Sequence, residues 1–183
     1  MKPASTASYH PPHKPSHPWI GFLGFGAAVA AAALFGSRYS PKNRRTRAWY
    51  ESLDKPSYNP PDKVFPAVWS ILYSLIAISG WRAWRAPDSP ERSHALRLWK
   101  AQLVANAEWS LLFFGEHQPR KALMDAMLLE TLILRYIKTV SEVDEAAALA
   151  VIPYAAWVAF AVILNADIAR RNPEAATMPP KAA

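Results

Sequence analysis

Aromatic and amide side chains recur at helical spacing in three separate apolar stretches of this 183-residue chain. Because residues three and four apart share one face of an α-helix, each set forms a stripe along its helix. Flat aromatic walls with a few hydrogen-bonding groups suit a planar apolar ligand, such as a tetrapyrrole or a sterol. The same spacing is also typical of ordinary packing between helices, so both interpretations stay open. The stripes are Phe65, Trp69, Tyr73, Ile76 and Gly80; Gln102, Asn106, Trp109 and Phe113; and Trp157, Ala161, Leu164 and Asn165.

Three uncharged runs are long enough to carry these helices across a membrane. Trp19–Gly36 and Val64–Trp81 each hold eighteen uncharged residues, and Ala146–Ala166 is longer still. At about 1.5 Å per residue, eighteen helical residues span most of a hydrocarbon core of about 30 Å. Pro153 lies inside the last run and predicts a kink there, because proline lacks a backbone N–H. A cleaved signal peptide is the alternative for the first run.

Two weaker runs, Ala101–Gly115 and Ala122–Leu134, contain amide and carboxylate side chains. Short connections place them between the stronger spans, and a carboxylate facing lipid would cost several kcal/mol. We therefore expect both runs to cross the membrane with their polar groups facing the bundle interior. The polar residues in question are Asn106, Glu108, Asp125 and Glu130.

The sequence thus predicts an all-α fold, an integral membrane bundle of five transmembrane helices over residues 19–170. A proline-rich, disordered N-terminal tail at 1–18 and a C-terminal tail at 171–183 would flank it. Lys and Arg favour the 37–63 loop and the C-terminus on the cytoplasmic side, with twelve on that side against nine on the other. The expected spans are about 19–36, 63–84, 95–115, 119–138 and 144–168.

Composition excludes several classes of site. The chain has no cysteine, which rules out disulfides, thiolate metal sites and cysteine nucleophiles. The net charge of +7 comes from basic residues that flank the apolar runs, a pattern typical of membrane anchors rather than of nucleic-acid binding. No Ser/His/Asp set, Gly-rich phosphate loop or metal-spaced cluster supports a hydrolase or a kinase. We expect His94 and His117 to be solvated or capping groups, so no metal site is predicted.

A loop with three prolines, "WYESLDKPSYNPP" (residues 49–61), separates the first two apolar runs. Its prolines stiffen the chain, and its aromatic residues Trp49, Tyr50 and Tyr58 would be poorly accommodated in water. We expect these rings to pack onto the mouth of the bundle or to lie at the headgroup level. The loop is therefore a candidate lid.

Four segments together resemble the family of tryptophan-rich sensory proteins, which includes the mitochondrial translocator protein or peripheral benzodiazepine receptor. They are Trp49–Tyr73, Gln102–Gly115 ("QLVANAEWSLLFFG"), Asp125 and Pro153–Asn165 ("PYAAWVAFAVILN"). The resemblance implies a five-helix membrane protein, often a homodimer, with a pocket beneath the first loop. In that family the pocket binds porphyrins, haem and, in some members, cholesterol and benzodiazepine-type drugs.

Carried onto this chain, the resemblance implies a set of residues that line or close the pocket. Trp69 and Trp157 also match positions where some bacterial members need tryptophan for light-driven breakdown of porphyrin. No cofactor is required, and porphyrin or haem is the expected ligand. The implied ligand-binding residues are Trp49, Phe65, Val68, Trp69, Asn106, Trp109, Phe113, Asp125, Leu128, Trp157, Ala161 and Leu164.

The chain departs from the family pattern where sterols are concerned. Ala166 occupies a position where sterol-binding animal members have tyrosine, which weakens the expectation of sterol binding. A short copy of the proposed cholesterol pattern at Leu134–Lys138 is of a kind that is common by accident. The roles of Glu108 and Glu130 stay open.

We therefore expect a membrane-embedded tetrapyrrole-binding protein that acts as a sensor, scavenger or transporter. The alternatives are a light-dependent porphyrin-degrading enzyme, a sterol- or drug-binding translocator, and a structural membrane protein without a ligand. The tail lacks the Arg- and Ser-rich signature of a transit peptide, which favours a bacterial membrane over the mitochondrial outer membrane.

Overall fold

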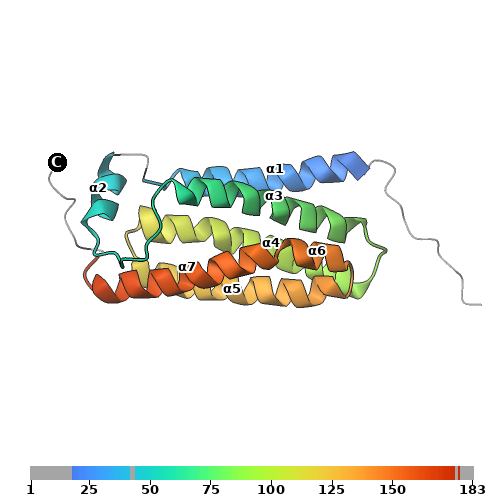
Figure 1. The fold of residues 1–183 in the computed structure, drawn as a ribbon. Coiled ribbons are helices and arrows are strands. Elements are labelled where there is room, and N and C mark those ends of the chain that lie inside the picture. Colours follow the sequence, from blue (N-terminus) through green and yellow to red (C-terminus); the bar gives the residue numbers. More distant parts are fainter. Residues whose placement is uncertain (1–17, 42–43, 176, 178–183) are drawn as a thin grey trace, which may run out of the picture.

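The computed structural model of the protein describes residues 18–41, 44–175 and 177, and every regular element within these ranges is a helix. The long helices run side by side along one axis, whereas α2 lies at one end of them (Figure 1). This arrangement confirms the predicted all-α bundle. The elements are α1 (Pro18–Ser37), α2 (Arg44–Ser52), α3 (Val64–Arg85), α4 (Pro90–Ser110), the π-helical turn η1 (Leu111–Gly115), α5 (Pro119–Ser141), α6 (Glu145–Ala150) and α7 (Ile152–Arg171).

Five helical segments make up the length of the bundle: α1, α3, α4 continued by η1, α5, and α6 continued by α7. They run side by side in Figure 1. The last segment is interrupted at Val151, whose φ of −102° and ψ of 2° leave the helical region. Pro153 follows in the first turn of α7, where a missing N–H disrupts no helical hydrogen bond. The kink predicted from this proline is thus a break two residues before it.

Local sequence explains where several helices begin. The Ser89 side chain accepts a hydrogen bond from the backbone N–H of Arg92 at 3.0 Å, and Pro90 opens α4. At α6, the Asp144 carboxylate accepts from the N–H of Ala147 at 2.8 Å. Such caps satisfy N–H groups that the first helical turn leaves free, and each stabilises its helix by about 1 kcal/mol.

Three helical segments in the described part of the chain are long and apolar enough to cross a membrane: Trp19–Ser37, Val64–Arg85 and Glu145–Arg171. Only 6% of the apolar window of α1 is buried, so this helix lies on the outside of the bundle. The more polar α4 and α5 pack against each other, and α5 also packs against α7. They can therefore cross a membrane only as part of the bundle.

Burial of the polar groups on α4 and α5 only partly follows the expectation. Asn106 is 5% exposed and Asp125 is 8% exposed, as expected for residues that face the interior. Glu130 is partly buried, but Glu108 is exposed, so the expected burial of Glu108 is wrong. Glu108 follows Asn106 by two residues, which turns its side chain about 200° around the helix, away from the inward stripe.

Ile76 and Gly80, at the C-terminal end of the α3 stripe, take part in packing between helices. A Cβ atom placed on Gly80 would lie 2.5 Å from Nε1 of Trp99 and 2.7 Å from a ring carbon of Phe25. The Trp99 indole crosses this gap and donates a hydrogen bond to the carbonyl of Ile76 at 2.9 Å. Glycine is therefore required at position 80, because any side chain would displace an indole held between α3 and α4.

Candidate functional site

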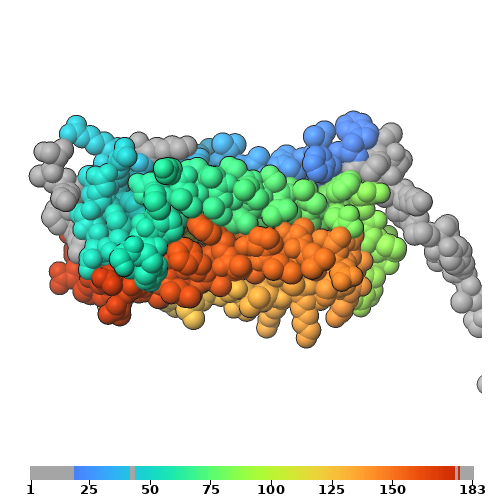
Figure 2. Space-filling view, in the orientation of Figure 1, coloured from blue at the N-terminus to red at the C-terminus, as the bar shows by residue number. Residues whose placement is uncertain are grey.

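An apolar groove of about 440 Å³ lies between α3 and α7. Figure 2 shows the two helices, α3 in green and α7 in orange, side by side on one face of the molecule. Small side chains at Pro153 and Ala156 keep α7 from filling the space opposite Ile71, which is 63% exposed. The groove therefore opens on the outer surface that would meet lipid. Its lining consists of Val68, Ile71, Leu72, Pro153, Ala156 and Trp157.

Of the lining residues of the groove only Trp157 is aromatic, and Phe65, Trp69 and Tyr73 lie close to the lining residues of α3 in the chain. Trp157, in its lining, packs edge-to-face against Phe65, with ring centroids 5.9 Å apart and an interplanar angle of 73°. Trp69, adjacent to the lining residue Val68, lies 5.2 Å from Tyr73 at 33°. The structure thus brings the implied residues Phe65, Val68 and Trp157 together at one opening, with Trp69 next to them in the chain.

The indole N–H groups divide the tryptophans into two kinds. Trp49 Nε1 donates to the carbonyl of Ala175 at 3.0 Å, and Trp109 Nε1 donates to Oδ1 of Asn165, also at 3.0 Å. Within the described part of the chain, neither Trp69 nor Trp157 has an acceptor for its indole N–H. Both side chains are only partly buried, and neither indole nitrogen is among the buried polar atoms that lack a partner. Trp157, which lines the groove, therefore has a donor that stays accessible to a ligand.

Four other implied residues lie instead in a packed group that we call the lid cluster: Trp49, Trp109, Phe113 and Leu164. Trp49 is completely buried, stacks on His117 at 4.1 Å and contacts Phe113 edge-to-face at 5.7 Å. Trp109 stacks on Phe113 at 4.9 Å and 17°. The rings pack directly against one another. These residues therefore attach the loop to the bundle rather than line an open space.

Asn106 belongs to a network of hydrogen bonds between helices. Its Oδ1 accepts from the Tyr73 hydroxyl at 3.0 Å, and its Nδ2 donates to the Tyr154 hydroxyl at 3.2 Å. The Tyr154 hydroxyl donates in turn to Oε1 of Gln102 at 2.9 Å. These bonds join α3, α4 and α7. Sequence reasoning noted both amides but missed Tyr154, for which its own helix offers no signal.

The remaining implied residues are spread around the bundle. Asp125 is buried on α5, and its Oδ2 has no hydrogen-bond partner in the described part of the chain. Leu128 is 53% exposed on the outer side of α5, away from the groove. Ala161 is partly buried one turn beyond Trp157. The structure therefore does not bring Asp125 or Leu128 to the opening that holds Trp157.

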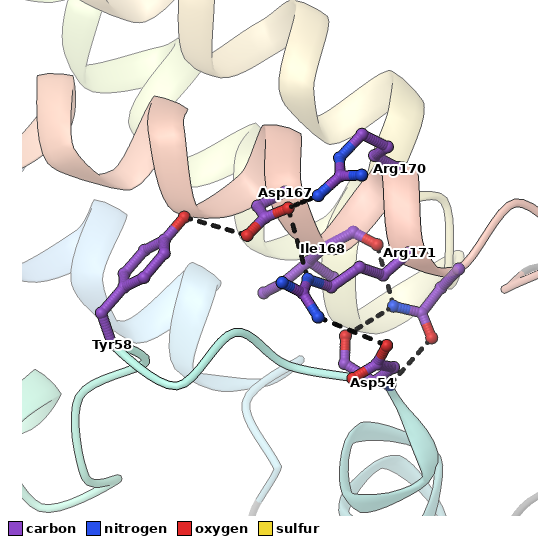
Figure 3. Close-up of polar contacts among 7 residues, drawn as sticks. Asp54, Tyr58, Asp167, Ile168, Arg170 and Arg171 are labelled. Atoms are coloured by element: carbon purple, nitrogen blue, oxygen red, sulfur yellow. Dashed lines mark hydrogen bonds and ion pairs between the residues drawn. The ribbon is translucent and has the colours of Figure 1, made fainter.

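A set of polar contacts fastens the proline-rich loop to the C-terminal end of α7 (Figure 3). The backbone N–H of Asp54 donates to Oδ1 of Asn172 at 2.9 Å, and Nδ2 of Asn172 donates back to the Asp54 carbonyl at 2.9 Å. The Tyr58 hydroxyl donates to Asp167 at 3.2 Å, and Arg171 lies 3.6 Å from the Asp54 carboxylate. We call these contacts the latch.

Of the latch residues, the sequence pointed only to Tyr58, as an aromatic residue of the candidate lid. Asp54 and Asn172 are 118 positions apart in the chain and belong to no recognisable pattern. Asn172, which makes the reciprocal backbone contacts, is only 3% exposed. A buried amide that satisfies both its donor and its acceptor on one backbone segment fixes that segment strongly. The loop is accordingly fixed to the end of α7 near its centre.

The two histidines of the bundle differ in setting. His94 is exposed, whereas His117 stacks on Trp49 and has a φ of 57°. Burial, with the positive charge of Arg45, lowers the pKa of His117 from its ordinary value. Among the described residues no group of three His, Asp or Glu side chains could hold a metal ion. His10, His13 and His17 lie outside the described residues.

Comparison with known proteins places this architecture in a family. The model of the TspO/MBR family matches residues 25–171. Tryptophan-rich protein TspO of Chlorobaculum tepidum is 35% identical over 151 residues, covering 78% of this chain and 90% of that protein. Protein CrtK of Rhodobacter capsulatus is 34% identical over 153 residues, covering 83% and 92%. The Translocator protein of Homo sapiens is 32% identical over 157 residues, covering 85% and 92%.

The family match includes all or part of every long helix, and the three relatives are matched over most of their length. Both findings agree with a bundle that has three helices able to span a membrane in the described part of the chain. The chain therefore belongs to the TspO/MBR family and is an integral membrane protein.

Proposed function

We propose that the protein binds a flat, largely apolar tetrapyrrole such as protoporphyrin or haem in the groove between α3 and α7. The observation that carries this proposal is the Trp157 indole in the groove lining, whose N–H has no acceptor in the described part of the chain. The groove volume of about 440 Å³ lies within the usual range of small-molecule sites, about 300–1,000 Å³. Apolar walls with one indole donor suit a ring system that carries a few polar groups.

The position of the groove sets the route of the ligand. Because it opens on the outer face of α3 and α7, an apolar ligand would enter from the bilayer without release of the latch. The flat face of the ring would lie against Trp157, whose partly buried indole is held by Phe65. The lid cluster would then close the bundle end rather than enclose the ligand.

Sensing, scavenging or transport is the biological role we propose for this binding. Two relatives are named tryptophan-rich sensory protein and translocator protein, which supports a role in sensing or in movement of a ligand. A groove open to lipid suits a protein that collects an apolar ligand from the membrane. The expected homodimer and the bacterial membrane as host both remain predictions.

Fluorescence quenching tests the site. Protoporphyrin added to the detergent-solubilised protein should quench tryptophan emission, and Trp157→Ala should weaken its affinity roughly ten-fold, since a stacking surface contributes about 1–1.5 kcal/mol. Trp81→Ala is the matched control, because Trp81 lies near the opposite end of α3 and outside the groove lining. Equal affinities for the two variants would contradict the groove assignment. A larger loss in Trp49→Ala than in Trp157→Ala would move the site beneath the lid.

Light-driven breakdown of the bound porphyrin is a second candidate function. Trp69 and Tyr73 are two oxidisable side chains 5.2 Å apart on α3, and they follow the lining residues Val68 and Leu72 directly in the chain. Such a reaction would need dioxygen as the oxidant and light to excite the porphyrin. Illumination of the complex in air should then bleach the porphyrin absorbance more slowly in Trp69→Phe than in the unaltered protein. Equal bleaching rates would contradict a role of Trp69 in breakdown and would support binding only.

A further inference from the structure

A second opening, of about 610 Å³, lies where the end of α1, the start of α2 and η1 meet. Its character differs from that of the groove between α3 and α7. Arg38, Arg45 and His117 line one part, while Leu111 and Phe114 line another. A pocket with cationic and apolar walls suits a ligand that is anionic at one end and apolar at the other.

The two arginines of this pocket carry uncompensated charge. Within the described part of the chain, the guanidinium groups of Arg38 and Arg45 make no hydrogen bond or ion pair. The pocket also contains Glu116, but this carboxylate is paired with Lys121 at 3.7 Å. The pocket therefore has two guanidinium groups available to an anion, and guanidinium groups bind phosphate in bidentate fashion.

The walls of the pocket are held in place by close packing. A Cβ atom on Gly115 would lie 2.8 Å from the ring of Tyr39, so glycine allows the end of α1 to meet η1. His117 is fixed from behind by its stack on Trp49. Thr46, in the first turn of α2, also lines the space, and that turn contains no acidic residue. Helix N-termini have free N–H groups that favour anions.

The location points to lipid as the source of the anion. Arg38 follows directly on Ser37, the last residue of α1, a helix with the length and apolarity of a membrane span. On the last turn of that helix, Leu34 is 66% exposed and Phe35 is 37% exposed. An acyl chain could lie against these side chains while its headgroup reaches the arginines. Clustered basic residues at a membrane surface are a common signature of anionic-lipid recognition.

We propose that this pocket binds the phosphate headgroup of an anionic phospholipid, with the lipid chains along the exposed face of α1. Arg38 and Arg45 would contact the phosphate, and Leu111 and Phe114 would contact the glycerol region. The site is separate from the groove between α3 and α7 and does not depend on tetrapyrrole binding.

Native mass spectrometry of the full chain in mild detergent tests this proposal. Dioctanoyl phosphatidylglycerol should bind more tightly than dioctanoyl phosphatidylcholine. Because each arginine near a membrane surface contributes about five-fold in affinity for anionic lipid, Arg38→Gln with Arg45→Gln should weaken phosphatidylglycerol binding about 25-fold. Arg47→Gln is the matched control, since Arg47 is also on α2 but is paired with Glu51 at 3.1 Å and lies outside the pocket lining.

Three results would overturn the proposal. They are equal binding of the two lipids, an equal loss in the double variant and in Arg47→Gln, and displacement of phosphatidylglycerol by inorganic phosphate at the same concentration, which would indicate a site for a free anion. Circular dichroism should show the same helicity in both variants. A second pair, Arg38→Lys with Arg45→Lys, should retain the preference for phosphatidylglycerol because it keeps both charges.

Discussion

The lid cluster and the groove between α3 and α7 are built from the same kinds of residue, yet they are in opposite states. In the lid cluster, Trp49 and Trp109 are packed against other rings and both indole N–H groups have acceptors. At the groove, Trp157 is only partly buried and its N–H has no acceptor within the described part of the chain. Aromatic residues in a bundle therefore indicate a binding surface only where their polar atoms and contact surfaces are left unsatisfied.

The largest test of this contrast compares Trp49→Ala with Trp157→Ala. Trp49 is completely buried, so its truncation leaves a cavity and should destabilise the protein by about 3–5 kcal/mol. Trp157 is only partly buried at an open groove, so its truncation should lower stability much less while weakening protoporphyrin binding. Thermal melts in detergent, with and without protoporphyrin, measure both effects. Similar losses of stability in the two variants would remove the distinction.

Gly80→Ala tests whether Trp99, whose indole N–H has an acceptor, can shift to make room for a side chain. The added methyl group would meet Nε1 of Trp99 at 2.5 Å, which should destabilise the bundle by about 1–3 kcal/mol. Gly24→Ala is the matched control, because a Cβ atom at Gly24 meets nothing within 4 Å. In a thermal melt the control should be neutral or slightly stabilised, since alanine favours helix over glycine. An unchanged melt for Gly80→Ala would show that Trp99 is free to move.

Asn172→Ala separates the lid from the groove by opening the latch. It removes the reciprocal contacts with Asp54, which should raise the opening of residues 53–63 about ten-fold, because the loss of a buried hydrogen bond costs about 1–3 kcal/mol. Hydrogen exchange of the loop amides measures this opening. Protoporphyrin affinity should stay unchanged if the ligand enters from the bilayer. Thr131→Ala, which alters an exposed side chain of α5 whose hydroxyl bonds within its own helix, should leave both values unaltered.

The smallest expected effect is a pH dependence of the lid cluster. Burial and Arg45 lower the pKa of His117, so the unfolded chain binds a proton more readily than the folded protein does. The free energy of unfolding should therefore be highest above the ordinary histidine pKa of 6.5 and fall slightly as the pH drops below it. His117→Asn, which tolerates the positive φ, should flatten this dependence in melts between about pH 5 and pH 7.5. If the variant showed the same dependence of stability on pH, that dependence would belong to another titratable group.

Much of the fold could be predicted from local sequence. The uncharged runs, the prolines at helix starts and the 3.6-residue periodicity specify the helices, because each depends on residues within a few turns of one another. The family resemblance implied that Phe65, Val68 and Trp157 belong to one site, and the structure brings them close together on the neighbouring helices α3 and α7. Their role in binding a ligand stays a prediction. Glu108 was misjudged, since a single carboxylate inside an apolar run does not show which side of the helix it is on.

Only the tertiary structure decided which tryptophans are buried with an acceptor for the indole N–H and which are not. Trp49 finds its acceptor at Ala175, which is 126 positions away, and the proline-rich loop finds Asn172 at a separation of 118. The sequence by itself predicted that Trp69, Trp109 and Trp157 lie on helical stripes with other aromatic and amide side chains. Whether an indole meets an acceptor depends on how helices from distant parts of the chain meet, and no local pattern records that geometry.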